Sequence, residues 1–166
     1  MTTVTPNEHM LHEVLRTHGP ALRRVARAYA GDDGEEEDLY QEILLQLWRA
    51  LPSFRGDAAP GTWSYRVALN TALAWRRSAR RRTARSEQVR LDAVQAGSTP
   101  PATRTETAIL REFMNALSDV DRTVLVLYME GLDNDGIADV VGISTGAVAV
   151  RVHRMRKKFA TTYVER

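Results

Sequence analysis

Asn70 is the residue of this 166-residue chain whose neighbours suggest the most specific chemistry. It lies in the stretch TWSYRVALNTALAWRRSARRR (62–82), which holds two of the three tryptophans, one tyrosine and a series of arginines. Arginines alone would bind phosphates, and rings alone would belong to a core. An amide among guanidinium groups can also hydrogen-bond the edge of a base, and only an unpaired base exposes its whole edge. The combination therefore favours contact with melted or single-stranded DNA over intact duplex.

The positions of these residues predict a helix with two different sides. One side carries a polar stripe, with Trp63 beside it, formed by Arg66, Asn70, Arg77 and Arg81. The far side holds residues that are expected to pack, namely Tyr65, Leu69 and Ala72. Trp75 is also expected to belong to a core. The DNA-binding groups would thus be held on the outside of a well-packed helix.

The segment 118–159 predicts a helix-turn-helix. Residues that cap helices alternate with glycines that end them, in the order Ser118 or Asp119, Gly131, Asp133, Gly142 and Ser144. In the last helix a core stripe is expected at Val148, Val152, Met155 and Phe159, and the opposite side carries Gly146, Val150, His153, Arg154 and Lys157, with Ala149 at its margin. Two short helices, a glycine turn and a basic third helix are typical of a domain that binds the major groove. An ordinary three-helix bundle with a basic end is the alternative interpretation.

Helical periodicity dominates the N-terminal part as well, and no alternating strand pattern stands out. A first helix is expected over 10–30, interrupted near Gly19-Pro20. The next helix, DLYQEILLQLWRAL (38–51), opens after an acidic run and is ended by Pro52. Its apolar residues are expected on one side: Leu39, Ile43, Leu44, Leu47, Trp48 and Leu51.

The remaining boundaries define the expected fold class. The loop SFRGDAAPG (53–61) leads into the arginine-rich helix, which is expected to end at about Arg82. Between 86 and 106 apolar spacing is lost, and Gly97, Pro100 and Pro101 exclude a long helix, which predicts a flexible linker. The fold is therefore expected to be all-α, with two small helical domains (1–85 and 107–166) joined by that linker, the C-terminal one a helix-turn-helix.

Composition excludes several classes of function. The net charge is only +2, yet an acidic run at 32–38 and a basic run at 76–90 separate the two signs along the chain. The absence of cysteine excludes disulfides, thiolate zinc sites and a redox switch within the chain. No signal peptide or membrane span is expected, so the expected location is the cytoplasm. An enzyme built from the acidic run with His9 and His12 is disfavoured, because neither a nucleophile–base pair nor metal-ligand spacing is present.

Three segments, in this order, resemble the extracytoplasmic-function (ECF) sigma factors, small initiation subunits of bacterial RNA polymerase in the sigma-70 family. They are DLYQEILLQLWRALPSF, FRGDAAPGTWSYRVALNTA and GLDNDGIADVVGISTGAVAVRVHRMRKK. The resemblance implies a transcription initiation factor that is not an enzyme and needs no metal or cofactor. It would bind polymerase core, direct it to specific promoters and help to melt the DNA. The implied partners are the clamp of the largest polymerase subunit, the beta subunit, promoter DNA in duplex and melted form, and an anti-sigma factor.

The resemblance also implies roles for individual residues. The first segment corresponds to the helix that docks on the polymerase clamp, with candidates Asp38, Gln41, Glu42, Leu45 and Gln46. The second corresponds to the part that recognises and melts the downstream promoter element, with candidates Phe54, Arg55, Trp63, Arg66, Asn70, Arg77 and Arg81. Asn70 occupies the position where such factors hold a flipped-out base. The third, about Asn134 to His153, corresponds to the part that recognises the upstream element, with candidates Ser144, Thr145, Ala149, Val150, His153, Arg154 and Lys157.

Some positions depart from the pattern of the family. The first helix is expected to be short. Gly136 stands where relatives usually carry a helix-forming polar residue, at a cost of about 1 kcal/mol to its helix. The recognition helix has AVAVR, whereas relatives generally carry a basic residue at the position of Ala149 and a small polar one at Val150. The upstream contact is therefore expected to be weak or of different specificity. A stand-alone helix-turn-helix regulator that never binds polymerase is the alternative function, although it leaves Asn70 and the clamp-like helix without a role.

Overall fold

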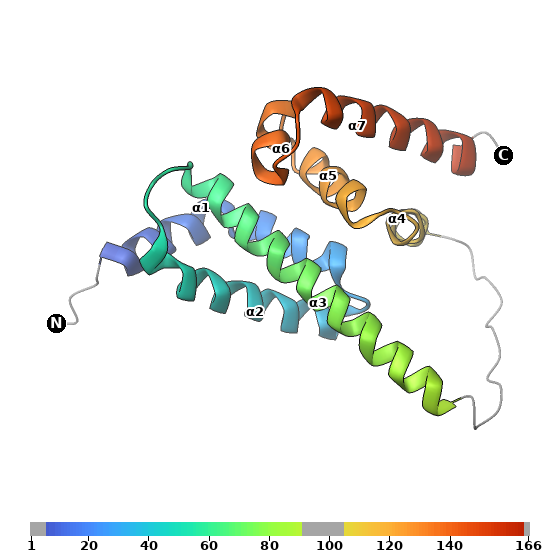
Figure 1. Ribbon diagram of the computed structural model, residues 1–166, viewed down its shortest axis with the longest axis horizontal. Helices are drawn as coiled ribbons and strands as arrows, with labels where there is room; N and C mark the ends of the chain where they lie inside the picture. The colour runs from blue at the N-terminus through green and yellow to red at the C-terminus, as the bar shows by residue number, and fades with distance from the viewer. Residues whose placement is uncertain (1–5, 91–104, 165–166) are drawn as a thin grey trace.

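The computed structural model describes residues 6–90 and 105–164, and every regular element within them is helical (Figure 1). The elements in chain order are α1 (Pro6–Tyr29), α2 (Asp33–Ala50), the 3-10 turn η1 (Leu51–Ser53), α3 (Pro60–Arg90), α4 (Glu106–Asn115), α5 (Asp119–Met129), α6 (Asn134–Val141), α7 (Thr145–Phe159) and the π-helical turn η2 (Ala160–Val164). We call α1–α3 the N-terminal unit and α4–η2 the C-terminal unit. The expected all-α class with a C-terminal helix-turn-helix is confirmed.

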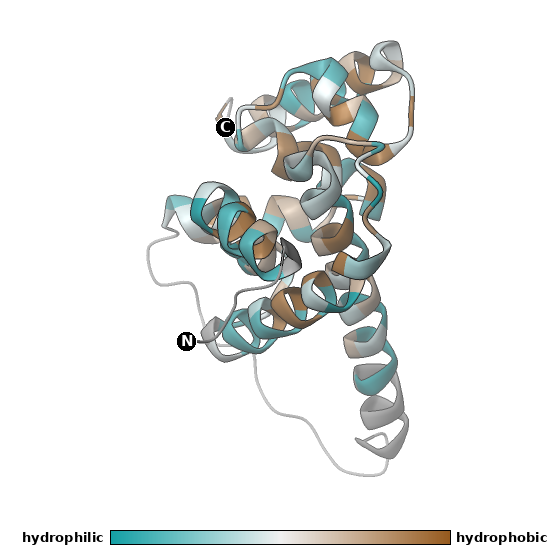
Figure 2. Cartoon of the chain, turned by 90° about the vertical axis from the view of Figure 1, so that its left-hand side faces the viewer, coloured by the Kyte–Doolittle hydropathy of each residue, from teal (hydrophilic) through white to brown (hydrophobic). Residues whose placement is uncertain are grey.

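The N-terminal unit is a bundle in which α1, α2 and α3 all pack against one another (Figure 1). Its core consists of fully buried side chains from the three helices, among them Leu22, Val25, Leu39, Ile43, Leu47, Ala68 and Ala72. Tyr65, Leu69 and Ala72 are buried, as the sequence predicts for the far side of α3. Figure 2 shows that the hydrophobic positions lie on the inner sides of these helices. Because the hydrophobic sides of α2 and α3 are buried in the bundle, their polar sides face outward.

The first helix is not interrupted at Gly19-Pro20, and it begins at Pro6, before the expected start at residue 10. Pro20 lies inside the 24-residue helix α1. A proline within a helix removes one backbone hydrogen bond and commonly costs about 3 kcal/mol. Here the helix continues because both of its halves are anchored in the bundle, with Val14 on one side of the proline and Leu22 on the other, both buried. Tertiary packing therefore outweighs the local preference.

The acidic run belongs to α2 rather than preceding it. The helix begins at Asp33, and the side chain of Asp32 accepts a hydrogen bond from the Glu35 backbone N–H at 2.8 Å as its N-cap. Carboxylates in a first turn are stabilised by the partial positive charge of the helix N-terminus. Glu36 is buried and binds Arg27 (Nε to Oε2, 2.8 Å) and Arg23 (Nε to Oε1, 3.3 Å) on α1. The acidic run thus ties α2 to α1.

The third helix extends to Arg90, beyond the expected end near Arg82. The first residues of the expected linker, 86–90, are therefore helical. The added stretch contains no proline or glycine, and its arginine and glutamine side chains favour helix. The rest of the expected linker lies mostly in 91–104, outside the described residues.

The C-terminal unit has the caps and turns that its sequence predicts. Ser118, Asp133 and Ser144 cap α5, α6 and α7, each by accepting a backbone N–H at the third residue beyond it. Gly131 and Gly142 have positive φ angles of 83° and 77°, which only glycine adopts without strain. The helix-turn-helix is therefore formed by α6 and α7, with Gly142 in its turn.

The two units lie against each other and share buried contacts. The Tyr29 hydroxyl on α1 is 2.7 Å from the Thr123 hydroxyl on α5, and both residues are buried. Arg122 on α5, 2% exposed, donates to the backbone carbonyl of Ala28 at 3.2 Å and lies over the Tyr29 ring. Burial lowers the pKa of Arg122 to about 10 and raises the pKa of Tyr29 to about 12. Sequence periodicity gives no sign of this contact.

Candidate polymerase and nucleic-acid interfaces

The outer face of α2 carries the residues that the sequence assigns to polymerase binding. Asp38, Gln41 and Leu45 are exposed, and Glu42 and Gln46 are partly exposed. The amide of Gln46 donates to Glu42 at 2.7 Å, and that of Gln41 donates to Glu37 at 2.9 Å. This face lies opposite the buried Leu39, Ile43 and Leu47. The structure thus groups all five candidates on one accessible polar surface.

Trp48 belongs to this face and not to the apolar stripe expected from the sequence. Its side chain is 48% exposed, while Leu45, one turn earlier, is 40% exposed. Leu44, placed on the same apolar stripe, is half-buried. Residues three apart on a helix are neighbours, so Leu45 and Trp48 form one apolar patch among polar side chains. An exposed apolar patch rimmed by polar groups marks an interaction surface.

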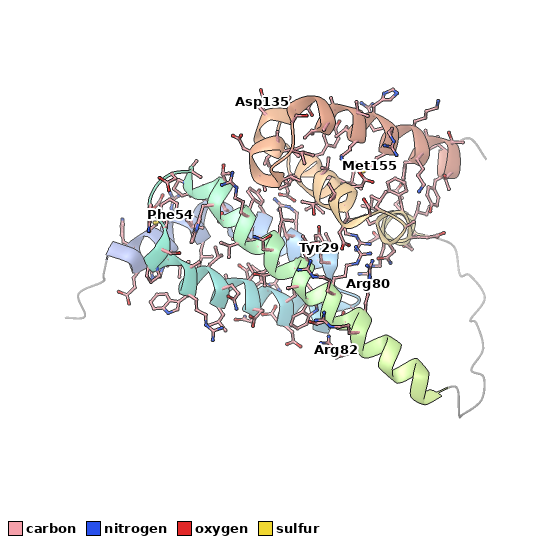
Figure 3. All side chains as sticks on the ribbon, viewed as in Figure 1. Tyr29, Phe54, Arg80, Arg82, Asp135 and Met155 are labelled. Atoms are coloured by element: carbon pink, nitrogen blue, oxygen red, sulfur yellow. The ribbon has the colours of Figure 1, made fainter. Side chains whose placement is uncertain are left out.

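The loop between α2 and α3 brings two predicted DNA-binding rings together. The Phe54 ring lies 5.1 Å from the Trp63 ring at an interplanar angle of 55°. Figure 3 shows Phe54 at the end of the bundle where α2 leads into this loop. Arg55 beside it is exposed, and Gly56 has a φ of 79° that turns the chain towards α3. Aromatic rings at such a loop offer flat surfaces on which unpaired bases can stack.

The stripe of α3 predicted from the sequence is present on the accessible side of the helix. Arg66, Asn70, Arg77 and Arg81 are all exposed. Trp75 is half-buried and packs against the core as expected, and the guanidinium of Arg82 lies 5.9 Å from its ring centre. Asn70 thus projects its amide between arginines on a helix fixed by the opposite, buried side.

Arginines of α3 also contact the C-terminal unit, which the sequence does not predict. Arg66 Nε donates to the backbone carbonyl of Asp139 on α6 at 3.1 Å. Arg76 Nη1 lies 2.8 Å from Asp119 Oδ1 on α5, and Arg80 Nη2 lies 4.0 Å from the same oxygen. Burial, with the nearby charge of Arg80, lowers the pKa of Arg76. Tyr29 and Arg80 are labelled in Figure 3, between the two units.

The outer side of α7 carries the remaining candidates. Ala149, Val150, His153, Arg154 and Lys157 are exposed, with Val150 at 58%. Val148 and Met155 are buried, and Val152 and Phe159 pack against the core, which confirms the predicted stripe. The first turn is held rigidly, because the Thr145 hydroxyl donates to Asp135 Oδ1 at 2.7 Å and the Ser144 hydroxyl caps the helix. Figure 3 shows Asp135 at the outer edge of this unit.

An ion pair within the C-terminal unit joins the middle of α7 to α5. Arg151 Nη1 lies 2.6 Å from Asp121 Oδ1 on α5. Burial alone would raise the pKa of Asp121, but the hydrogen bonds from Arg151 and Ser118 outweigh it, so the pKa is lowered. Arg151 is thus engaged within the unit, whereas Arg154 and Lys157 point outward. The exposed pair is suited to DNA phosphates, which position a protein on the duplex without carrying sequence information.

Comparison with known families decides the identity of the chain. The model of "Sigma-70 region 2" matches residues 14–82, and that of "Sigma-70, region 4" matches residues 107–159. The ECF RNA polymerase sigma-E factor of Escherichia coli (strain K12) is 30% identical over 139 residues, covering 75% of this chain and 71% of that protein. The sigma-E factor of Salmonella typhimurium (strain LT2) matches to the same extent. The chain is an ECF sigma factor of the sigma-70 family.

As an ECF sigma factor, the chain is an initiation factor that binds RNA polymerase and directs it to specific promoters. Members of this family are initiation factors, not enzymes. The match to region 2 excludes the alternative of a helix-turn-helix regulator independent of polymerase. From here we call the N-terminal unit region 2 and the C-terminal unit region 4.

Solved structures share the fold. Sigma factor RpoE in complex with the anti-sigma factor NepR from Bartonella quintana has a TM-score of 0.71 at 23% identity, covering 93% of this chain and 98% of that one. CnrH in complex with the cytosolic domain of CnrY has a TM-score of 0.63 at 25% identity, covering 91% and 85%. Within the described ranges, no helix is long and apolar enough to cross a bilayer. Nor do three metal-ligating side chains come together anywhere in that part of the chain.

Proposed function

We propose that the sigma factor uses three separate surfaces for three steps of initiation. The outer face of α2 docks on the clamp of the largest polymerase subunit. The α3 stripe, with the Phe54–Trp63 rings, recognises and melts the downstream promoter element. The outer side of α7 recognises the upstream element. The chain catalyses no reaction of its own in these steps and uses no cofactor.

The exposed amide of Asn70 on the arginine stripe is the observation that carries this proposal. It lies on a helix whose opposite side is buried, so its position is fixed before DNA arrives. Extracting a base from the stack costs a few kcal/mol, and hydrogen bonds to the edge of the extruded base offset part of that cost. Neighbouring guanidinium groups can hold the flanking phosphates. Asn70 therefore holds one flipped-out base while Arg66, Arg77 and Arg81 grip the strand.

A second contact with polymerase is supported by an apolar hollow in region 4. A cavity of about 280 Å³ opens between α4, α5 and α7, lined among others by Leu110, Leu125, Tyr128 and Phe159. The Phe113 and Phe159 rings pack edge to face at 5.1 Å beside it. This hollow lies away from the outer side of α7, so it remains accessible while α7 binds DNA. We assign it to the beta subunit.

One of the similar solved structures is a sigma factor in complex with an anti-sigma factor. We infer that this chain is controlled by such a protein as well. Because the chain has no cysteine, a thiol-based signal would have to be sensed by that partner.

The function is tested by run-off transcription with purified core polymerase on a library of genomic fragments. The sigma factor is expected to give discrete transcripts from a small subset of fragments, and core alone to give none of them. The Asn70→Ala variant is expected to lose these transcripts while still binding core. Transcripts that do not change with Asn70→Ala would contradict the assigned role of α3.

A further inference from the structure

His18 on α1 lies in direct contact with the first turn of α3. A Cβ atom at position 61 would stand 2.8 Å from both Cε1 and Nε2 of the His18 ring. Carbon atoms normally meet at about 3.5–4.0 Å, so a side chain at this position would overlap the ring. The φ angle of Gly61 is not positive, so its backbone conformation does not itself require glycine. Gly61 is therefore needed for the close approach of His18.

The His18 ring also contacts the core of region 2. Its centroid lies 6.2 Å from that of the Tyr65 ring in an edge-to-face arrangement, which is a favoured geometry for aromatic pairs. Tyr65 is buried and lies one turn beyond Gly61 on α3. The His18 ring is thus held against two successive turns of the same helix. It cannot turn away from Gly61 without a change in its contact with Tyr65.

Hydrogen bonds make the first turn of α3 one unit with the pair of rings at this end of the bundle. The Ser64 hydroxyl, which is fully buried, donates to the carbonyl of Gly61 at 2.8 Å. The backbone N–H of Trp63 donates to the carbonyl of Ala59 at 3.0 Å. The Trp63 ring in turn packs at 5.1 Å against Phe54. A shift of Gly61 would therefore move Trp63 as well.

A cavity beside His18 makes this contact more important. Its volume is about 700 Å³, and His18 lines it together with Glu13 and Val14 of α1 and with Pro60 and Thr62 of α3. Because a hollow of this size adjoins the first turn, neighbouring side chains do not hold the turn as a close-packed core would. The His18 ring spans the gap between α1 and the turn.

We propose that His18 is a positioning residue for promoter melting, because its ring sets the place of the first turn of α3 and, through it, of the Phe54–Trp63 pair. The proposal rests on the role assigned to those rings and adds the residue that orients them. His18 acts by the shape of its ring and touches no DNA itself. Bases stack only on rings that face them correctly, so a displaced pair would slow strand opening. Affinity for core polymerase would not change, since α2 carries that contact.

The first measurement follows Trp63 in the free, full-length chain. The chain has three tryptophans, so a nitrogen–proton correlation spectrum contains three indole N–H signals, and Trp63→Phe identifies that of Trp63. Gly61→Ala is expected to shift this signal, because the added methyl meets the His18 ring. In a His18→Ala background the same substitution is expected to leave the signal nearly in place, because the ring is gone. The signals of Trp48 and Trp75 are the internal controls.

The second measurement follows promoter opening by the holoenzyme through permanganate reactivity. His18→Ala and Gly61→Ala are each expected to slow opening about tenfold. Independent losses would multiply to about a hundredfold, whereas the double variant is expected to lose no more than about tenfold. His18→Phe keeps a flat ring, and the adjoining cavity has room for its larger size, so opening at the parental rate is expected. Circular dichroism confirms that each variant is folded, and titration with core polymerase should give the parental Kd.

Four results would overturn the proposal. They are a Trp63 signal that Gly61→Ala leaves in place, parental opening by His18→Ala, losses that multiply in the double variant, and a loss with His18→Phe as large as with His18→Ala. A failure of the proposed function would be recognised separately. Trp63→Ala would then open promoters as fast as the parent chain, while the Trp63 signal would still shift in Gly61→Ala.

Discussion

Leu45 and Trp48 lie one turn apart on the outer face of α2, and both keep a large part of their apolar surface exposed, 40% and 48%. Leu47, which lies between them in the sequence, is buried in the core of the bundle. Exposed apolar side chains at the centre of a polar face are the positions where interfaces concentrate binding energy. This pair is therefore the anchor that we expect to enter the polymerase clamp.

Leu45→Glu is expected to weaken core binding by about 2 kcal/mol, roughly 30-fold in Kd, because a charge would be desolvated at the centre of the interface. The fold should be unaffected, since Leu45 lies outside the core. Fluorescence titration with core polymerase measures the change. Val120→Glu is the matched control, because Val120 on α5 is also 40% exposed. Equal affinity of Leu45→Glu and the parent chain would refute the assignment of α2.

Trp48→Ala tests the half of the anchor that the sequence pattern placed in the core. If Trp48 contacts the clamp, its truncation should weaken core binding by about 2 kcal/mol, as is common for a tryptophan at an interface centre. Thermal unfolding of the free chain should change little, because the side chain is already half in solvent. A large loss of thermal stability with unchanged affinity for core polymerase would show that Trp48 stabilises the fold and does not contact the clamp.

Asn70→Ala should impair strand opening after polymerase has docked. The variant loses one amide from an exposed stripe, so core affinity is expected to equal that of the parent chain. Permanganate reactivity of promoter thymines should fall sharply, because no side chain then holds the extruded base. Templates with a pre-melted bubble should restore the part of the activity that depends on opening. Parental permanganate reactivity in the variant would disprove the role of Asn70.

Glu36 should contribute to stability in a pH-dependent manner. Hydrogen bonds from Arg27, opposed by burial, and the charges of Arg27 and Arg23 lower its pKa below the ordinary 4.5. A carboxyl with a lowered pKa stabilises the fold fully above its unfolded pKa, and this contribution is lost as the pH falls through the folded pKa. Glu36→Gln should therefore reduce the free energy of unfolding at pH 7 by about 1 kcal/mol.

Urea unfolding of the two proteins between pH 7 and pH 3 measures this effect. The difference between parent and Glu36→Gln should shrink below about pH 4.5 and approach zero at the acid end. Glu37→Gln, which alters an exposed neighbour that also binds Arg23, should have a much smaller effect. A difference that stays constant across this pH range would show that Glu36 acts through packing and not through its charge.

The parts of the fold that depend on local sequence were predictable. Caps at Ser118, Asp133 and Ser144 and turns at Gly131 and Gly142 follow from side chains within three residues. The sides of α3 and α7 that pack into the cores of their own units follow from helical periodicity, because apolar residues recur on one side of each helix. The membership of the α3 stripe was predictable for the same reason.

Features that depend on distant residues were not predictable. Pro20 remains in a helix because the bundle holds both of its sides, and Trp48 is exposed because no element among residues 6–90 and 105–164 covers that side of α2. The buried Arg122 donates a hydrogen bond to the backbone carbonyl of Ala28, which is 94 residues away in sequence. Contacts of this kind carry no periodic signal in either partner, so the association of regions 2 and 4 emerged only from the structure.

The composition of the recognition helix predicts an unusual upstream element. Ala149 and Val150 are exposed on α7 and cannot donate hydrogen bonds, so they cannot make the bidentate contact with guanine that arginine or lysine makes. Small apolar groups in the major groove do have one specific partner, the methyl group of thymine. We expect A·T pairs opposite these two residues, with affinity that depends strongly on phosphate contacts by Arg154 and Lys157.

Replacement of upstream thymines by uracil tests this expectation, because it removes only the methyl group. Binding of the holoenzyme should weaken by at most about 1 kcal/mol for each methyl that Ala149 or Val150 contacts. Arg154→Ala should instead weaken binding to all sequences alike and reduce the dependence of affinity on salt. If uracil has no effect at any upstream thymine while Arg154→Ala still weakens binding, then α7 holds the DNA backbone without recognising methyl groups. Region 4 would in that case contribute affinity for the promoter but little of its sequence specificity.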